Sequence, residues 1–282
     1  MKKTARNCLL AAALLLPACS TIDFSPIVGG QDLAEPGQII WHDYLTDDLT
    51  GAKSFYGELF DWQFQSRRKY LVIVNGDKEI GGMVELIDPT ERRRSSGWLP
   101  YLATERIEEE AEWVESLGAK ILSGPAEMQN RGRYLTLADP SGAVIVLLEH
   151  PGGTAARDQI ESGEWLWDEL WTSEVETALH FYQEICGYSV EQVHRQGELP
   201  YWLLQGRGGA ALAGLTEMPF SGLQSQWVPV IRVDDPVETA NQALELGGRI
   251  LIKPDHPLSD GTIALIRDPL GGIFMVESWD EL

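Results

Sequence analysis

An aromatic residue and a carboxylate recur two positions apart at two places in the sequence. Trp41 precedes Asp43, and Trp167 precedes Glu169. Because successive strand residues point to opposite faces, each pair shares one face if its segment is a strand. A carboxylate beside an aromatic wall can take a proton or orient a ligand amine. Asp43 and Glu169 are therefore the candidate catalytic residues.

The two faces extend by one more residue each, to Leu45 and Trp171. The candidate ligand-binding residues are Trp41, Asp43, Trp167, Glu169 and Trp171. The alternative is structural, with each acid bonded to a neighbouring strand or to an arginine, and each tryptophan in the core. Arg133 and Arg232 are the possible arginine partners.

A different chemistry is expected at the N-terminus. Basic residues precede an unbroken apolar run, Leu9 to Leu16, which is shorter than the about 20 residues that span a bilayer. The following Pro17-Ala18-Cys19 completes a string that resembles the lipobox of bacterial lipoproteins. The resemblance implies a signal peptide over residues 1–18 and a diacylated Cys19. Ser20 after the cysteine implies the cell envelope, at the periplasmic face of the outer membrane. An ordinary secretory signal is the alternative.

Composition restricts the partners. The formal charge is −21, and loss of residues 1–18 leaves 19 basic against 43 acidic residues, or about −24. Such a surface repels phosphate backbones, so we expect no nucleic-acid partner. It also repels anionic lipid, so the protein would be held at the membrane through the lipid anchor at Cys19. The remaining free thiol, Cys186, lies in an apolar helical stretch and is expected to be buried.

The chain repeats itself. Trp41 to Thr46 matches Trp167 to Thr172 at an offset of 126, and a Phe-Tyr pair follows each segment after nine residues. Farther along, Trp98 matches Trp227, and an Asp-Pro-x-Gly motif recurs, at an offset of 129. We therefore predict two copies of one domain. The predicted organisation is a signal peptide at 1–18, a lipidated tether at 19–37, a first domain at 38–150, a linker at 151–163 and a second domain at 164–282.

Each copy is predicted to contain two units of strand, helix and three strands. In the first unit, Ile39 to Leu45 has strand character and Leu49 to Phe60 has helical periodicity, with Asp47 or Asp48 as the N-cap. In the second, Gly118 should end a helix over Ile107 to Leu117. The predicted fold class is α+β, with four βαβββ modules in two tandem cup-shaped domains.

These motifs resemble the vicinal oxygen chelate superfamily, which includes glyoxalase I, extradiol dioxygenases and bleomycin-resistance proteins. The resemblance extends over about residues 38–279 and implies that each cup holds a ligand. Enzymes of the family bind a divalent metal through histidine and glutamate. Aligned on this chain, those positions fall on Trp41, Leu99, Val146, Trp167, Val228 and Met275, with Glu85 and Glu217 as the remaining candidates. None of the first six is a ligand for such an ion. No metal site and no cofactor are therefore predicted, and a divalent metal is the alternative.

The histidines do not form a ligand cluster in the sequence. His42 is next to an aligned ligand position but should face the helix or solvent, away from the cup, because strand residues alternate. A slip of one residue, which would place His42 in the cup, is the alternative. We therefore expect a membrane-anchored lipoprotein that binds a small molecule in a metal-free cup. The alternatives are a metal-dependent lyase or dioxygenase of the glyoxalase type, and a non-catalytic scaffold lipoprotein.

Overall fold

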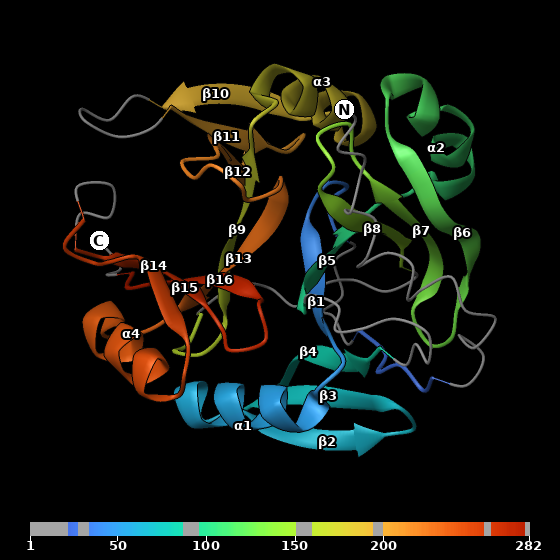
Figure 1. The fold of residues 1–282 in the computed structure, drawn as a ribbon. Helices are drawn as coiled ribbons and strands as arrows, with labels where there is room; N and C mark the ends of the chain where they lie inside the picture. The colour runs from blue at the N-terminus through green and yellow to red at the C-terminus, as the bar shows by residue number, and fades with distance from the viewer. Residues whose placement is uncertain are drawn as a thin grey trace, which may run out of the picture.

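Two eight-stranded mixed sheets form the protein in the computed structural model, which describes residues 22–27, 34–86, 96–150, 160–193, 200–256 and 261–279. The strand order is β2-β3-β4-β1-β5-β8-β7-β6 in the first sheet and β10-β11-β12-β9-β13-β16-β15-β14 in the second. Each sheet joins two βαβββ modules through its central antiparallel pair, β1 with β5 and β9 with β13. The predicted α+β class and the tandem repeat are confirmed (Figure 1).

The first domain contains two modules of similar order. Its elements are β1 (Ile39–Thr46), α1 (Leu49–Phe60), β2 (Gln63–Arg67), β3 (Tyr70–Asn75), β4 (Lys78–Glu85), β5 (Gly97–Ala103), α2 (Ile107–Trp113), the 3₁₀ helix η3 (Val114–Leu117), β6 (Lys120–Met128), β7 (Gly132–Ala138) and β8 (Val144–Glu149).

The second domain repeats this order. Its elements are β9 (Trp165–Thr172), α3 (Val175–Cys186), β10 (Ser189–Val193), β11 (Tyr201–Gln205), β12 (Ala211–Glu217), β13 (Gln226–Arg232), α4 (Pro236–Glu245), β14 (Arg249–Ile252), β15 (Ile263–Arg267) and β16 (Ile273–Glu277).

Local sequence signals explain several of these boundaries. The carboxylate of Asp48 accepts a hydrogen bond from the Gly51 N–H, 2.8 Å away, and caps α1. The helix expected at 107–117 consists of α2 followed by the tighter turn of η3. Gly118 ends it with a φ of 92°, in the left-handed region that glycine adopts without strain. In the described part of the chain, no helix is both long and apolar enough to cross a membrane.

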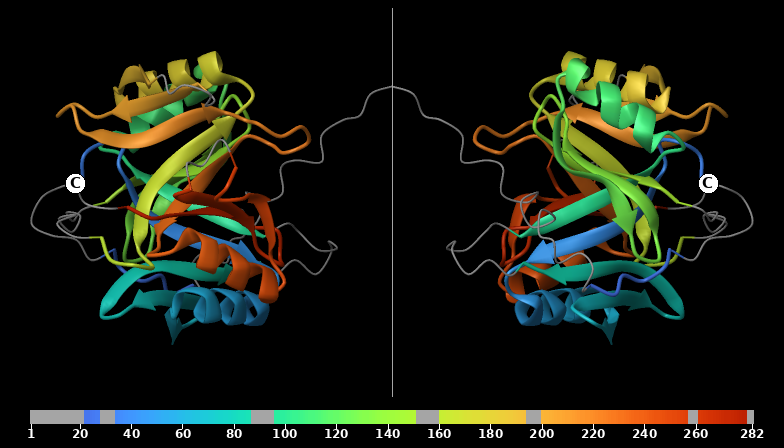
Figure 2. Two further views of the ribbon diagram at one scale, coloured as in Figure 1. Left: turned by 90° about the vertical axis from the view of Figure 1, so that its left-hand side faces the viewer. Right: turned by 90° about the vertical axis from the view of Figure 1, so that its right-hand side faces the viewer.

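The two sheets pack back to back, with their helices between and beside them. One buried cluster joins residues of β7, β8 and α2 to residues of α3 and β12, and a second joins α1 and β4 to β13, α4 and β16. The α1 and α4 helices touch where Gln242 donates to the Glu58 carbonyl at 2.8 Å. Figures 1 and 2 show β1, β5, β9 and β13 in the middle of the molecule. The concave faces, called here the first cup (β1 to β8) and the second cup (β9 to β16), therefore face away from each other.

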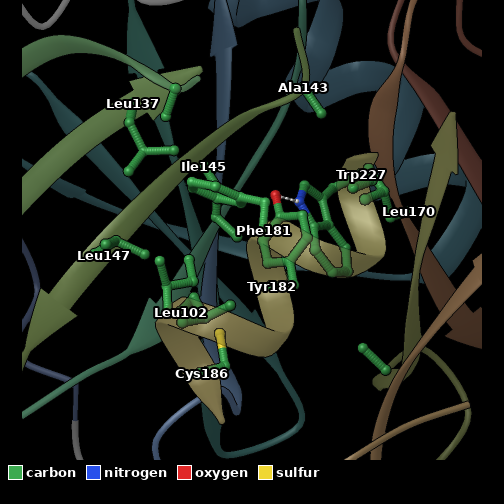
Figure 3. Close-up of a cluster of buried hydrophobic side chains, with 14 of the residues drawn as sticks. Leu102, Leu137, Ala143, Ile145, Leu147, Leu170, Phe181, Tyr182, Cys186 and Trp227 are labelled. Carbon is green, nitrogen blue, oxygen red and sulfur yellow. Dashed lines mark hydrogen bonds between the residues drawn. The ribbon is translucent and has the colours of Figure 1, made fainter. Parts of the chain in front are cut away.

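The repeated Phe-Tyr and Asp-Pro motifs meet across the domain boundary. Tyr182 of α3 donates to Asp139 in the turn before β8 of the other domain, at 3.0 Å. Trp227 in turn donates to the Tyr182 hydroxyl at 2.9 Å, and Figure 3 shows this bond inside the buried cluster. Asp139 also accepts from two backbone N–H groups of its own turn, at Ser141 and Ala143. The repeat thus builds the contact between the domains.

The reciprocal contact uses the same residue types. Tyr56 of α1 donates to Asp268 at 2.7 Å, and Trp98 donates to the Tyr56 hydroxyl at 3.0 Å. Tyr44 gives Asp268 a further hydrogen bond, at 2.5 Å. Burial raises the pKa of Asp268, and the charge of Asp268 adds to the effect of burial in raising the pKa of Tyr56. Both domains therefore present a buried carboxyl to a tyrosine of the other.

Candidate functional site

The predicted acid and aromatic residues of the first domain do share the face of the first cup. Trp41 Nε1 donates to Asp43 Oδ1 at 2.9 Å, and Leu45 lies in the same buried cluster. Tyr70 of β3 and Tyr101 of β5 donate to the two oxygens of Asp43, at 2.6 and 2.7 Å. The carboxylate is fully buried, so these donors replace the water that it lacks.

Arg131 fills the centre of the first cup. Its Nη1 lies 2.9 Å from Asp43 Oδ2, and both side chains are 0% exposed. Its other donors reach the Tyr70 hydroxyl at 2.5 Å and the Ser25 carbonyl at 3.0 Å. Burial alone would lower the pKa of Arg131, but Asp43, Tyr70 and Tyr101 together outweigh burial, and the pKa lies above its usual value. The cup therefore contains a permanently charged guanidinium.

Four aromatic rings enclose this guanidinium. Its central carbon lies 4.9 Å from the ring centre of Phe24, 5.0 Å from Trp41, 5.3 Å from Tyr70 and 5.1 Å from Tyr101. All four distances are within the about 6 Å over which a cation interacts with the face of a ring. We call these four residues the arginine cage.

The segment 22–27 closes the first cup. Phe24 is 1% exposed, Ile27 is 7% exposed, and both belong to the cup cluster. The Ser25 hydroxyl donates to Glu79, which also pairs with Arg67 at 2.9 Å. This part of the predicted tether is therefore packed into the first domain. Trp41 and Asp43 are shielded from solvent by the chain itself.

The second cup contains the corresponding residues in a more accessible form. Trp167 Nε1 donates to the Tyr201 hydroxyl at 2.9 Å, as Trp41 does to Tyr70 at 3.1 Å. Trp171 Nε1 donates to Glu169 Oε2 at 2.8 Å. Trp167, Glu169 and Tyr201 are partly exposed. Trp167, Glu169 and Trp171 therefore lie together on one face of β9, where Trp171 is buried and the other two side chains are partly exposed.

A glycine beneath each cup tyrosine permits this arrangement. A Cβ atom at Gly82 would lie 1.7 Å from the Tyr70 hydroxyl, and one at Gly214 would lie 1.9 Å from that of Tyr201. Any side chain would therefore displace the phenol from the cup floor. The two cups thus share a tryptophan, an acid, a tyrosine and a glycine.

Acidic groups surround the tyrosine of the second cup. The pKa of Tyr201 is raised well above its usual value, first by burial and then by the charge of Glu169, with a smaller effect from Glu277. Glu277 lies two residues after Met275, which belongs to the second-cup cluster. Phe220 stacks on Trp171, with ring centres 6.3 Å apart. The second cup therefore combines apolar and aromatic surface with negative charge.

The aligned metal-ligand positions line the two cups. Trp41, Leu99 and Val146 belong to the first-cup cluster. Val228 and Met275 belong to the second, and Trp167 packs against it. None of these side chains can ligate a borderline divalent ion. Glu85 and Glu217 are exposed at the ends of β4 and β12.

The donor sets therefore do not fit the family's metal. Glu85 lies on the face of β4 that carries Met83, which packs in the interdomain cluster instead of the cup. No group of three or more His, Cys, Asp or Glu residues capable of holding a metal occurs in the described part of the chain.

His42 does face away from the cup, as predicted, but it contacts the other domain instead of a helix or solvent. Its Nε2 lies 2.7 Å from Asp168 Oδ1, and both residues are 2% exposed. The two positions are related by the offset of 126. The pseudo-twofold arrangement of the domains thus brings equivalent positions of β1 and β9 into contact.

The prediction that Arg133 or Arg232 is the arginine partner of Asp43 is wrong. Arg133 pairs with Glu108 and Glu127 on the other side of the sheet, whereas Arg131 pairs with Asp43. Arg232 donates to the Ile160 carbonyl. Sequence reasoning missed Arg131 because it lies in the turn before β7, where no periodicity applies. Its lack of a basic counterpart in the second copy was the one available signal.

A separate hollow of about 460 Å³ lies at the edge of the first domain. It is lined by Ala34, Ala103, Thr104, Glu105, Glu127, Gly132, Arg133, Glu149 and His150. It shares no residue with the arginine cage. The charge of Arg133 within it is already matched by Glu127 and by Glu108 of α2.

Comparison with known proteins agrees with this geometry. Residues 38–147 match the model of the Glyoxalase/Bleomycin resistance protein/Dioxygenase superfamily, so the first domain is similar to domains of this kind. The protein named "Putative glyoxylase CFP32" of Mycobacterium tuberculosis is 28% identical over 250 residues, which cover 84% of this chain and 92% of the relative. "Anthracycline biosynthesis protein DnrV" of Streptomyces peucetius is 26% identical over 260 residues, which cover 86% and 93%.

Solved structures show the same fold over both domains. The 2,2',3-trihydroxybiphenyl 1,2-dioxygenase of Sphingomonas wittichii superposes with a TM-score of 0.60 at 12% identity, over 87% of this chain and 91% of that one. The Mn(II)-bound glyoxalase of Novosphingobium aromaticivorans gives a TM-score of 0.57 at 15% identity, over 87% and 83%. The chain thus has the tandem fold of glyoxalases and extradiol dioxygenases.

Proposed function

We propose that the protein is a lipid-anchored member of the glyoxalase superfamily that binds a small molecule in its second cup, without a metal. One observation carries the proposal. Trp41, Asp43 and Tyr70 are at most 4% exposed in the first cup, whereas Trp167, Glu169 and Tyr201 are partly exposed in the second. The same side chains form a closed core in one domain and a solvent-facing surface in the other.

Apolar and aromatic walls with a few polar groups are typical of ligand sites. In the second cup, Trp171 and Phe220 supply stacked rings, and Val228 and Met275 supply apolar contact. Glu169 supplies the polar group. The names of the relatives, a glyoxylase and an anthracycline biosynthesis protein, connect similar chains with small molecules.

A screen of small aromatic fragments against the EDTA-treated full-length protein, read by saturation-transfer NMR, tests the proposal. We expect binders whose signal is lost in Trp171→Ala. Trp113→Ala is the matched control, because Trp113 is a partly buried tryptophan of α2 in the other domain. If no fragment depends on Trp171, the second cup is not a ligand site and the scaffold function is favoured.

A metal-dependent lyase or dioxygenase is the second candidate. The likeness of the fold to a Mn(II)-bound glyoxalase favours it. The side chains at the aligned ligand positions argue against it, because a catalytic metal needs about three protein ligands. One tightly held metal ion per domain, found by elemental analysis of the purified protein, would move this function to first place.

The membrane anchor is a separate part of the proposal. It rests on the string Leu16-Pro17-Ala18-Cys19 and on the short distance along the chain from Cys19 to the docked segment 22–27. Metabolic labelling with palmitate should mark the protein, and Cys19→Ala should abolish the label. Absence of label on the unchanged protein would refute the anchor while leaving the second cup unaffected.

A further inference from the structure

The segment that closes the first cup begins very close to the proposed lipid anchor. Ile22 is three residues after Cys19, and an extended chain spans at most about 3.6 Å per residue. Ile22 therefore lies within about 11 Å of Cys19. Ile22 packs against the first-cup cluster, and Phe24 is buried in it at 1% exposure. A lipid on Cys19 would therefore hold the rim of the first cup close to the membrane surface.

Two turns of the first domain hold this segment by hydrogen bonds. The Asp23 backbone N–H donates to the carbonyl of Arg68, in the turn between β2 and β3, at 3.0 Å. From the turn between β6 and β7, Asn130 Nδ2 donates to the Phe24 carbonyl at 3.1 Å and to the Asp23 carboxylate at 3.3 Å. The β2–β3 turn therefore lies beside the point at which the chain leads back to Cys19.

The tip of the β2–β3 turn consists of two exposed cations, Arg68 and Lys69. Lys69 has a φ of 57°, in the left-handed region of the backbone. Glycine and asparagine adopt this region readily, whereas the Cβ atom makes it unfavourable for most other residues. The geometry of the turn therefore does not account for a lysine at this position, whereas a role for its exposed charge does.

The charge at this edge differs from that of the chain as a whole. Among the described residues, Arg68 and Lys69 lie near the exposed Glu85, at the neighbouring end of β4, and near the partly buried Asp23. This edge is therefore close to neutral, whereas the chain beyond residue 18 has a formal charge of about −24. An anionic lipid surface attracts each exposed lysine or arginine near it, so it repels this edge less than the acidic remainder.

The second cup opens on the opposite side of the molecule. The first-cup cluster contains residues of the first domain only, and the second-cup cluster contains residues of the second domain only. The clusters that join the domains lie between the two cups. Figure 1 shows β2 and β3 at the bottom of the molecule and β10 to β12 at the top. A membrane against the rim of the first cup would therefore leave the second cup open to solvent.

We propose that the β2–β3 turn is a contact surface for anionic phospholipid headgroups, and that the protein rests on the membrane through its first cup with the second cup facing away. This inference rests on the lipid anchor of the proposed function. Arg68 and Lys69 pair with lipid phosphates, and the docked segment 22–27 sets the orientation. A ligand then reaches Trp167 from the aqueous side.

Paired fluorescent labels test the orientation. The full-length lipidated protein is reconstituted into vesicles of phosphatidylethanolamine and phosphatidylglycerol that contain a lipid with a quenching nitroxide on its headgroup. Ser66→Cys places a label at the β2–β3 turn, and Ser221→Cys places one next to Phe220 of the second cup; both serines are exposed. Cys186 is buried at 3% exposure and should not react. The label at residue 66 should lose most of its emission, and the label at residue 221 should keep it.

Variants of the turn separate its charge from the anchor. Lys69→Asn removes a cation but suits the left-handed backbone, so the melting temperature should not fall. Combined with Arg68→Gln, it should lower the ratio of contacting to non-contacting molecules, measured from fluorescence lifetimes at residue 66, by about fivefold for each cation. Vesicles of phosphatidylcholine, which have no net charge, should show no such decrease. Lys53→Asn, at an exposed lysine of α1, is the matched control and should change nothing.

The outcomes are distinct. Equal quenching of the two labels, or stronger quenching at residue 221, would overturn the orientation. Equal quenching at residue 66 in the unchanged turn and in the double variant would overturn the headgroup contact. In a protein that carries palmitate, either result refutes only this inference. Absence of palmitate would refute the anchor and the inference together, and the fragment screen decides the second cup independently.

Discussion

Removal of the Arg131 guanidinium should destabilise the protein strongly, because it leaves Asp43 buried without a charge partner. Both side chains are 0% exposed, and their charged atoms are 2.9 Å apart. Loss of one partner of a buried ion pair costs about 3 to 5 kcal/mol. Asp43 would keep its hydrogen bonds from Trp41, Tyr70 and Tyr101, which places Arg131→Met toward the lower part of this range.

The expected change is measurable by calorimetry of the full-length chain. A domain of 150 to 250 residues loses about 2 to 4 °C in melting temperature for each kcal/mol, so Arg131→Met should lower it by roughly 6 to 20 °C. Arg133→Met is the control, because Arg133 is half-exposed and its pairs with Glu108 and Glu127 are worth at most about 1 kcal/mol each.

A double variant tests the mechanism. Asp43→Asn combined with Arg131→Met should cost less than the sum of the two single variants, by about 1 to 3 kcal/mol, because no unpaired charge remains. Additive effects, or a loss in Arg131→Met no larger than in Arg133→Met, would refute the description of the first cup as a closed ion pair.

Three further predictions concern the domain contact, pH and metal. Tyr182→Phe removes a donor from the buried Asp139 and should cost about 1 to 3 kcal/mol in chemical denaturation; a neutral result would show that the contact is not needed. Burial raises the pKa of Glu110 from 4.5 to about 7, so the folded chain binds this proton more tightly than the unfolded chain does. As the pH rises from about 4.5 to 7, the free energy of unfolding should therefore fall by roughly 3 kcal/mol more than it does in Glu110→Gln. Parallel pH profiles of the two proteins would contradict this. EDTA should leave the melting temperature unchanged, and a fall of several degrees would reveal a structural metal.

The faces of the strands could be predicted from the sequence because alternation is a local property. Trp41, Asp43 and Leu45 share a cup in the structure, and Trp167, Glu169 and Trp171 share the other, as the period of two requires. The N-cap at Asp48 and the helix end at Gly118 likewise depend on residues within one turn.

Long-range contacts could not be predicted in this way. Arg131 reaches Asp43 over 88 residues of chain, and it does so from a turn. Phe24 lies in a short segment without periodicity, so nothing local marks it as part of a core. Tyr182 and Asp139 belong to motifs that were recognised, but their meeting depends on how two domains pack. The sequence repeat showed that His42 and Asp168 occupy equivalent positions, but it did not show that the two side chains are in contact.

The most direct test of the account is a crystal structure of the full-length chain grown with the tightest-binding fragment. The account predicts the fragment in the second cup, in contact with Trp167, Trp171 and Glu169, with no metal beside it and with Arg131 still paired to Asp43. A fragment in the first cup with segment 22–27 displaced, or a metal ion bound within either cup, would contradict it.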